Sequence, residues 1–77
     1  MSPAMRMQYK HIIDGATMTK GEIHVISKRL DQINEAADLC DASKDFDVLQ
    51  NLHIETSDLL EVLELSLSNI PTKEKDL

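Results

Sequence analysis

Apolar and small residues recur at intervals of three and four in two long stretches of the chain. The first set is Ile23, Ile26, Leu30, Ile33, Ala37 and Cys40, and the second is Leu49, Leu52, Thr56, Leu59, Leu63, Ser66 and Ile70. Such spacing places each set along one side of an α-helix, as in the seam of a heptad repeat. The pattern therefore predicts an all-α protein with two long helices that pack against each other.

Local signals predict where these helices begin and end. The run Thr19-Lys20-Gly21-Glu22 has the form of a capping box, so the first helix should begin near residue 20. Its seam ends at Cys40, and the short polar segment 41–45 leaves room only for a tight connection to the second helix, which predicts an antiparallel hairpin. The second helix should run from about Asp45 to Asn69, because Pro71 prevents its continuation. The hairpin thus spans residues 19–70, and a charged tail follows at 71–77.

Residues 1–18 form an amino-terminal arm with two competing patterns. Apolar or aromatic side chains at Met5, Met7 and Tyr9 alternate with Arg6, Gln8 and Lys10, which favours a strand or an extended segment. Helical spacing competes with this alternation, at Met5, Tyr9, Ile12, Ile13 and Ala16. The arm is therefore predicted as a strand or a short helix, and Asp14-Gly15 as the turn that ends it.

The second helix has a wider apolar arc than the first. Beyond its seam it carries additional apolar residues, so one facing helix cannot cover it and at least two neighbours are needed. The arm or a different protein could supply one, but a second copy of the hairpin would bury far more area. We therefore expect a homodimer that forms a four-helix bundle. The residues predicted at this dimer or partner interface are Val48, His53, Leu60, Val62 and Leu67.

Length and charge restrict the classes of function. A chain of 77 residues is one small domain, near the size at which a single core barely offsets chain entropy. Eight basic residues against 14 acidic ones give a formal net charge of -6, which disfavours binding to nucleic acid or to anionic membranes. No apolar run approaches the ~20 residues that span a bilayer, and the amino terminus lacks the apolar segment of a signal peptide, so a cytoplasmic location is expected.

The residue types that carry catalysis or bind metals do not form a recognisable pattern. The single cysteine, Cys40, lies on the first seam, where packing accounts for it. None of His11, His24 and His53 pairs with another histidine at helical spacing, and no zinc or phosphate-loop motif is present. We therefore expect no metal, no cofactor and no enzymatic activity.

Two acidic rows are the remaining candidates for a function. Asp31, Glu35 and Asp38 lie along the first helix, and Asp58, Glu61 and Glu64 lie along the second. Both rows are expected on solvent faces, where they either maintain solubility or dock a basic partner. The sequence thus favours a small acidic protein-binding module that acts through its surface, without catalysis, as an adaptor, inhibitor or regulatory subunit.

A dimeric transcriptional regulator is the alternative function. A strand followed by two helices suggests a DNA-binding protein whose paired strands enter the major groove, and Arg6 and Lys10 of the arm would contact DNA. The length of the first helix and the acidic character of both helices argue against this alternative.

Overall fold

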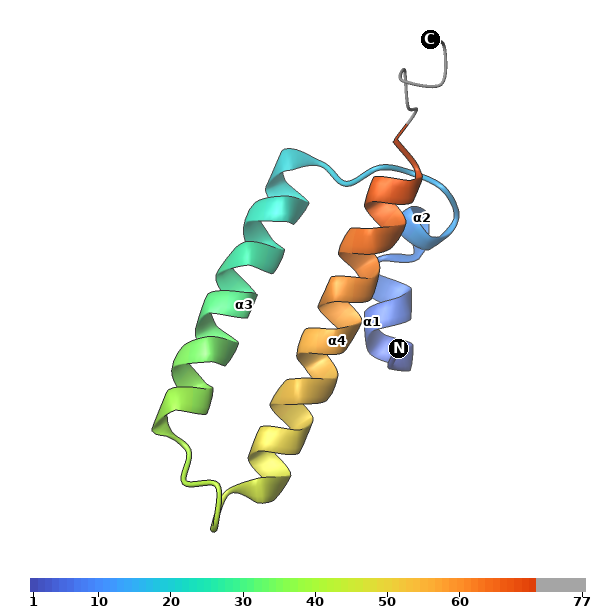
Figure 1. Cartoon of the computed structure of the whole chain (residues 1–77). Helices are drawn as coiled ribbons and strands as arrows, with labels where there is room; N and C mark the ends of the chain where they lie inside the picture. The colour runs from blue at the N-terminus through green and yellow to red at the C-terminus, as the bar shows by residue number, and fades with distance from the viewer. Residues whose placement is uncertain (71–77) are drawn as a thin grey trace, which may run out of the picture.

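A computed structural model describes residues 1–70, and these residues form α-helices and no strand. Two short helices, α1 (Pro3–Gln8) and α2 (Lys10–Ile13), precede two long ones, α3 (Lys20–Leu39) and α4 (Phe46–Ser68). Figure 1 shows α3 and α4 running in opposite directions, joined by a loop at residues 40–45. The predicted all-α class is therefore confirmed. The predicted tail at 71–77 lies outside the described residues.

The predicted capping box is present at the start of α3. The Thr19 hydroxyl accepts a hydrogen bond from the Glu22 N–H at 3.2 Å, and the Glu22 carboxylate accepts one from the Thr19 N–H at 2.9 Å. In the loop that follows α3, the Asp45 carboxylate accepts the Asp41 N–H at 2.9 Å, and the Asp41 carboxylate accepts the Ser43 N–H at the same distance. Short-range side-chain chemistry thus sets both the start of α3 and the turn into α4.

The arm is helical, so the strand prediction is wrong and the short-helix alternative is correct. Pro3 occupies the first turn of α1, where its missing N–H is no loss, and the Ser2 hydroxyl accepts the Met5 N–H at 3.3 Å. A helical arm places Tyr9 and Ile12 on the same side, whereas a strand would point them to opposite faces. Both side chains are buried in the same core cluster, as the helical arrangement allows. The chain then turns at Gly15, whose φ of 118° suits glycine.

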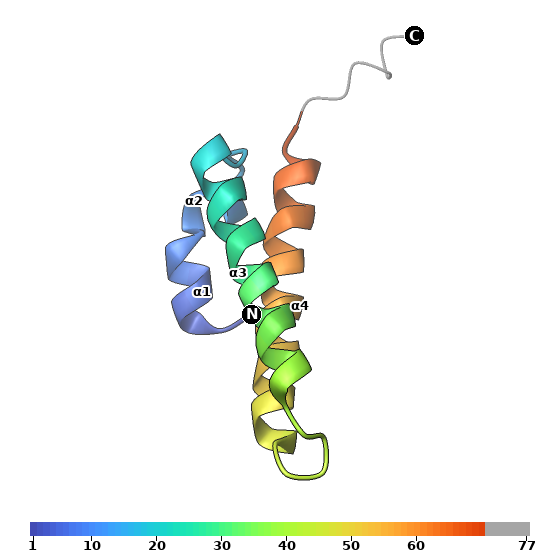
Figure 2. The same ribbon diagram turned by 90° about the vertical axis from the view of Figure 1, so that its left-hand side faces the viewer.

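The core forms where the arm meets the two long helices. Figure 2 shows α1 and α2 lying together on one side of the α3–α4 pair. The buried apolar residues come from all three parts of the chain: Tyr9, Ile12, Ile26, Ile33, Leu59 and Val62. The arm is thus an integral part of the core and supplies one of the neighbours that α4 needs.

This position of the arm corrects two assignments made from the sequence. Val62, predicted at a partner interface, has no exposed surface in the single chain, because the arm and α3 cover that side of α4. Asp58, predicted on a solvent-facing acidic row, is only 7% exposed, and its carboxylate accepts the Ser2 N–H at 3.1 Å. Neither residue is available to a partner.

Substituting a core leucine should destabilise the protein far more than substituting an exposed lysine. Leu59 is 2% exposed, so Leu59→Ala should lower the free energy of unfolding by about 2 to 5 kcal/mol through lost burial and a residual cavity. Lys28→Ala, at an exposed position of α3, should change it by less than about 0.5 kcal/mol. Urea unfolding followed by circular dichroism measures both values. Equal losses in the two variants would contradict this core.

Candidate protein-binding surface

One side of α4 is occupied by the arm. Asp58, Val62, Leu65 and Asn69 follow one another at intervals of four, three and four, which places them along a single side of the helix. The amide nitrogen of the Asn69 side chain donates to the carbonyl oxygens of Ile12 and Ala16, at 2.8 and 2.9 Å. Together with the bond from Ser2 to Asp58, these contacts attach the arm at both of its ends. No partner can reach this side of α4 while the arm is in place.

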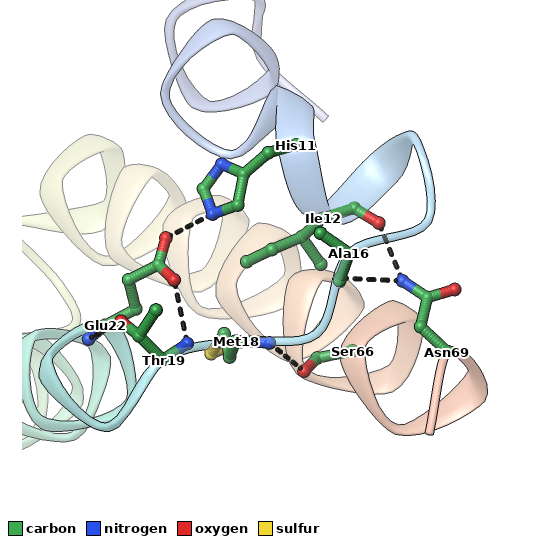
Figure 3. A network of polar contacts seen from close by, with 8 residues as sticks. All are labelled: His11, Ile12, Ala16, Met18, Thr19, Glu22, Ser66 and Asn69. Carbon is green, nitrogen blue, oxygen red and sulfur yellow. Dashed lines mark hydrogen bonds and ion pairs between the residues drawn. The ribbon is translucent and has the colours of Figure 1, made fainter. Parts of the chain in front are cut away.

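The end of the arm and the turn that follows it are joined to both long helices by polar contacts (Figure 3). The Met18 N–H donates to the Ser66 hydroxyl of α4 at 2.9 Å. His11 Nε2 lies 2.5 Å from the Glu22 carboxylate of α3. The pKa of Glu22 lies below the ordinary glutamate value of 4.5, chiefly because its carboxylate accepts the Thr19 N–H, with a further contribution from His11. The arm side of the molecule is therefore closed by polar bonds as well as by the core.

The opposite side of α4 is uncovered. A groove of about 510 Å³ lies between α3 and α4, lined by Leu30, Asp31, Ile33, Asn34, Ala37, Leu49, His53 and Thr56. From Thr56, the residues Leu60, Leu63 and Leu67 follow at intervals of four, three and four, so they extend the same side of α4. Leu60 is 49% exposed and Leu67 is 68% exposed. By helical spacing this surface lies on the side of α4 away from Asp58 and Asn69, which hold the arm.

We call this surface the open face and define it by Leu30, Leu49, Thr56, Leu60, Leu63 and Leu67. Two residues predicted at the interface, Leu60 and Leu67, belong to it, and His53 lines its groove. Val48 is exposed near the start of α4. The sequence reasoning assigned Leu30, Leu49 and Leu63 to the helix seams alone, yet they remain partly exposed. Heptad spacing could not reveal this, because it does not show how far a neighbouring helix covers a seam.

Charge is distributed unevenly along the hairpin. Six carboxylates and one lysine lie between Leu30 and Asp47, so the loop end of the hairpin carries a net charge of -5 out of the formal -6. Among the residues predicted on the acidic rows, Asp31, Glu35, Asp38, Glu61 and Glu64 are exposed. Nearer the middle of the hairpin, Arg29 of α3 forms a bidentate ion pair with Glu55 of α4, in which Arg29 Nη2 lies 2.7 Å from Glu55 Oε1. This pair lowers the pKa of Glu55.

A metal site or a membrane-spanning helix would point to a different function. Within residues 1–70, no group of three or more histidine, cysteine or acidic side chains is arranged to hold a metal ion. None of the described helices combines the length and the apolar character that crossing a bilayer requires. No protein-family model, curated protein or solved structure matches the chain. The open face, a contiguous row of partly exposed leucines beside the groove between the two long helices, is the candidate functional surface.

The network around Glu22 predicts a component of the acid sensitivity of folding. Because the folded pKa values of Glu22 and Glu55 are lowered, these carboxylates stabilise the fold above pH 4.5, and this stabilisation is lost as the pH falls through the folded pKa values. Glu22→Gln keeps a side chain able to complete the capping box but cannot titrate. Its free energy of unfolding should therefore fall less steeply than that of the native chain as the pH is lowered from 4.5 to about 2.5.

Urea titrations across this pH range measure that slope. Glu61→Gln is the matched control, because Glu61 is exposed and makes no hydrogen bond or ion pair within residues 1–70. The control should follow the native profile. A Glu22→Gln profile that also superimposes on the native one would show that the Glu22 contacts do not contribute.

Proposed function

We propose that this chain is a small acidic protein-binding module that works as an adaptor, inhibitor or regulatory subunit by covering a surface of another protein, without catalysis. We propose further that two copies associate through the open face into a dimeric four-helix bundle. The observation that supports both statements is the open face itself: a row of partly exposed leucines along one side of a hairpin whose other side is closed by the arm.

The physical argument rests on the uncovered apolar area. Each Å² of apolar surface removed from water contributes roughly 25 cal/mol, so leaving this row in solvent is costly for a domain of this size. Contiguous exposed apolar surface on small proteins is typical of interaction sites. A second hairpin laid over the open face would give α4 a third neighbour and each long helix the environment of a four-helix bundle. The arms would then lie on the outside of the two hairpins.

The acidic residues that remain at the surface favour a basic partner. Exposed charges steer the encounter between proteins and raise association rates, although they add little to final affinity. Glu61 and Glu64 are exposed on α4 and meet no basic residue of their own helix, because α4 contains neither lysine nor arginine. A positively charged partner would therefore be attracted and an acidic one repelled.

The alternative function, a DNA-binding regulator, depended on paired strands formed by the arm. In the described chain the arm is helical, and Lys10 of the arm pairs with Asp14 in an (i, i+4) ion pair. No observation therefore favours this alternative over protein binding. We expect the native chain to leave a DNA fragment unshifted in a gel-shift assay at low salt.

Introducing charge on the open face should prevent association. Sedimentation equilibrium at micromolar concentration should give twice the chain mass for the native protein and the single-chain mass for the double variant Leu60→Glu, Leu67→Glu, because burying unpaired carboxylates in an interface is costly. Both positions are about half exposed or more, so the folded single chain should tolerate the change. Circular dichroism should accordingly show unchanged helix content.

Leu39→Glu is the matched control for this experiment. Leu39 is 88% exposed at the end of α3 and does not line the groove, so the same chemical change there should leave the dimer intact. A native chain that sediments as a monomer up to millimolar concentration would refute the proposed dimer. Dissociation in the Leu39→Glu variant as well would show that added charge, and not the open face, is responsible.

Charge reversal on α4 tests the preference for a basic partner. For a protein captured from native extract, Glu61→Lys with Glu64→Lys should slow association and weaken its dependence on salt, while dissociation stays nearly unchanged. The matched variant Glu61→Gln, Glu64→Gln should give an intermediate association rate. Biosensor kinetics across a salt series measure both. Identical association rates in all three proteins would show that these carboxylates only maintain solubility.

A further inference from the structure

We propose that the second copy lies antiparallel on the open face, with a two-fold axis that crosses the helices at the level of Arg29 and Thr56. In this arrangement α4 packs against α4 of the second copy and α3 against its α3. The inference rests on the proposed dimer and adds its register and orientation. Three independent observations support it: the symmetry of leucines on α4, the order of charges on α3, and the ion pair that places the two patterns at the same height.

Four leucines of α4 are arranged symmetrically about Thr56, and Leu67 lies beyond them near the end of the helix. Leu52 and Leu60 lie four residues to either side of it, and Leu49 and Leu63 lie seven residues to either side. A two-fold axis through Thr56 therefore brings Leu49 opposite Leu63 of the second copy, and Leu52 opposite its Leu60. Each of these contacts would occur twice in the dimer, once in each direction, as a self-complementary interface requires.

Thr56 itself is suited to the centre of this interface. Its hydroxyl donates to the Leu52 carbonyl within the same helix at 2.9 Å. The only polar side chain in the symmetric row therefore has its donor satisfied before any partner arrives, so burying it leaves no unpaired hydrogen. The residue is partly buried in the single chain, which leaves part of its surface free to contact the second copy.

Lys20 and Asp38, near the two ends of α3, are ordered so that an antiparallel copy brings them into pairs. Lys20 and Lys28 lie in the first half of the helix, and Asp31 and Asp38 lie in the second half. Lys20, Asp31 and Asp38 are separated by eleven and seven residues, close to whole numbers of turns, so they share one edge of α3, and Asp31 borders the groove of the open face. All four residues are exposed, and no ion pair within residues 1–70 involves any of them.

The two patterns have their centres at the same height in the hairpin. Arg29 lies midway between Lys20 and Asp38, and Thr56 is the centre of the leucine row. Arg29 forms an ion pair with Glu55, which directly precedes Thr56. The centre of the α3 charges and the centre of the α4 leucines therefore lie side by side. One two-fold axis therefore satisfies both helices: it pairs the leucines of α4 and brings Lys20 next to Asp38 of the second copy.

Electrostatics also opposes the other way of stacking two such hairpins. With the axis parallel to the helices, α3 would face α4 of the second copy, and both loop ends, each with a net charge of -5, would meet at one end of the dimer. Because α4 contains neither lysine nor arginine, Asp38 would lose the lysine partner that the antiparallel arrangement gives it. The antiparallel arrangement instead places the loop ends at opposite ends of the dimer, where their mutual repulsion is weakest.

The native Cys40 reports directly on orientation. Cys40 is eleven residues beyond Arg29, so spin labels on the two copies should be separated along the helix direction by about 33 Å in the antiparallel dimer. With the axis parallel to the helices, both labels lie at the same end, within about 20 Å. Double electron–electron resonance on the full-length protein measures this distance. Ser43→Cys in a chain with Cys40→Ser repeats the measurement from the exposed loop.

The outcomes separate the register from the proposed dimer. A distance of about 30 Å or more from both label positions supports the antiparallel arrangement, a threshold that follows from the rise of about 1.5 Å per helical residue. A short distance in a protein that sediments as a dimer overturns the antiparallel arrangement and leaves the proposed dimer standing. A monomer overturns both.

Exchanging the charges of one ion pair tests the register independently. Lys20→Glu alone and Asp38→Lys alone each place like charges opposite one another, so each should weaken the homodimer roughly tenfold. In a mixed dimer of the two variants, the carboxylate introduced at position 20 of one copy faces the ammonium introduced at position 38 of the other. The unchanged Asp38 of the first copy likewise faces the unchanged Lys20 of the second, so both contacts again join opposite charges.

Native mass spectrometry of the mixture should therefore show the mixed dimer in excess over both homodimers. Lys10→Glu, a matched reversal on the arm side, should dimerise as the native chain does. A statistical mixture of the three dimers would overturn the Lys20–Asp38 contact.

Discussion

The structure depends on one constraint: α4 has more apolar surface than α3 can cover. A single facing helix buries Leu59 on one side of α4, and the arm, through Tyr9 and Ile12, helps to bury Val62 next to it. The third side, from Leu49 to Leu67, remains partly exposed in the single chain. In a domain this small, each neighbour of α4 adds a substantial part of the core, because surface is large relative to volume.

The polar contacts complement this hydrophobic constraint by deciding which side of α4 the arm takes. The Asp58 carboxylate accepts the Ser2 N–H, and the Ser66 hydroxyl accepts the Met18 N–H. The Asn69 side chain donates to the carbonyls of Ile12 and Ala16. The arm and the turn after it therefore have specific partners along one side of the helix. Burying such groups without partners would be unfavourable, and within residues 1–70 no buried side-chain nitrogen or oxygen lacks a hydrogen bond. The residues that define the open face are five leucines and Thr56, whose hydroxyl already bonds within its own helix, so this surface suits an apolar partner.

The proposed dimer and the acidic surface are consistent with each other. A net charge of -6 on each copy opposes self-association, and concentrating most of it at the loop end allows two copies to meet if those ends point apart. The antiparallel arrangement fulfils this condition and also uses the cationic first half of α3. The exposed carboxylates of α4 then remain on the outside, where they would guide a basic partner to the assembled module.

The sequence by itself determined the helices and their limits. Heptad spacing, the capping box at Thr19 and the polar loop at 41–45 act over a few residues, so α3 and α4 could be predicted with boundaries within a residue or two of those observed. The excess apolar arc of α4 was equally visible, because it too is a property of local spacing. Leu60 and Leu67 could therefore be predicted as exposed residues in need of a partner.

Tertiary structure alone decided the form of the arm and the side of α4 that it covers. Residues 5–13 satisfy both a period of two and a helical period, and the choice depended on the burial of Tyr9 and Ile12 together against a distant helix. The same contact buried Val62 and Asp58, which the sequence had placed on the surface. Local spacing shows which side chains share a face of a helix, but which faces meet depends on contacts between residues more than forty positions apart.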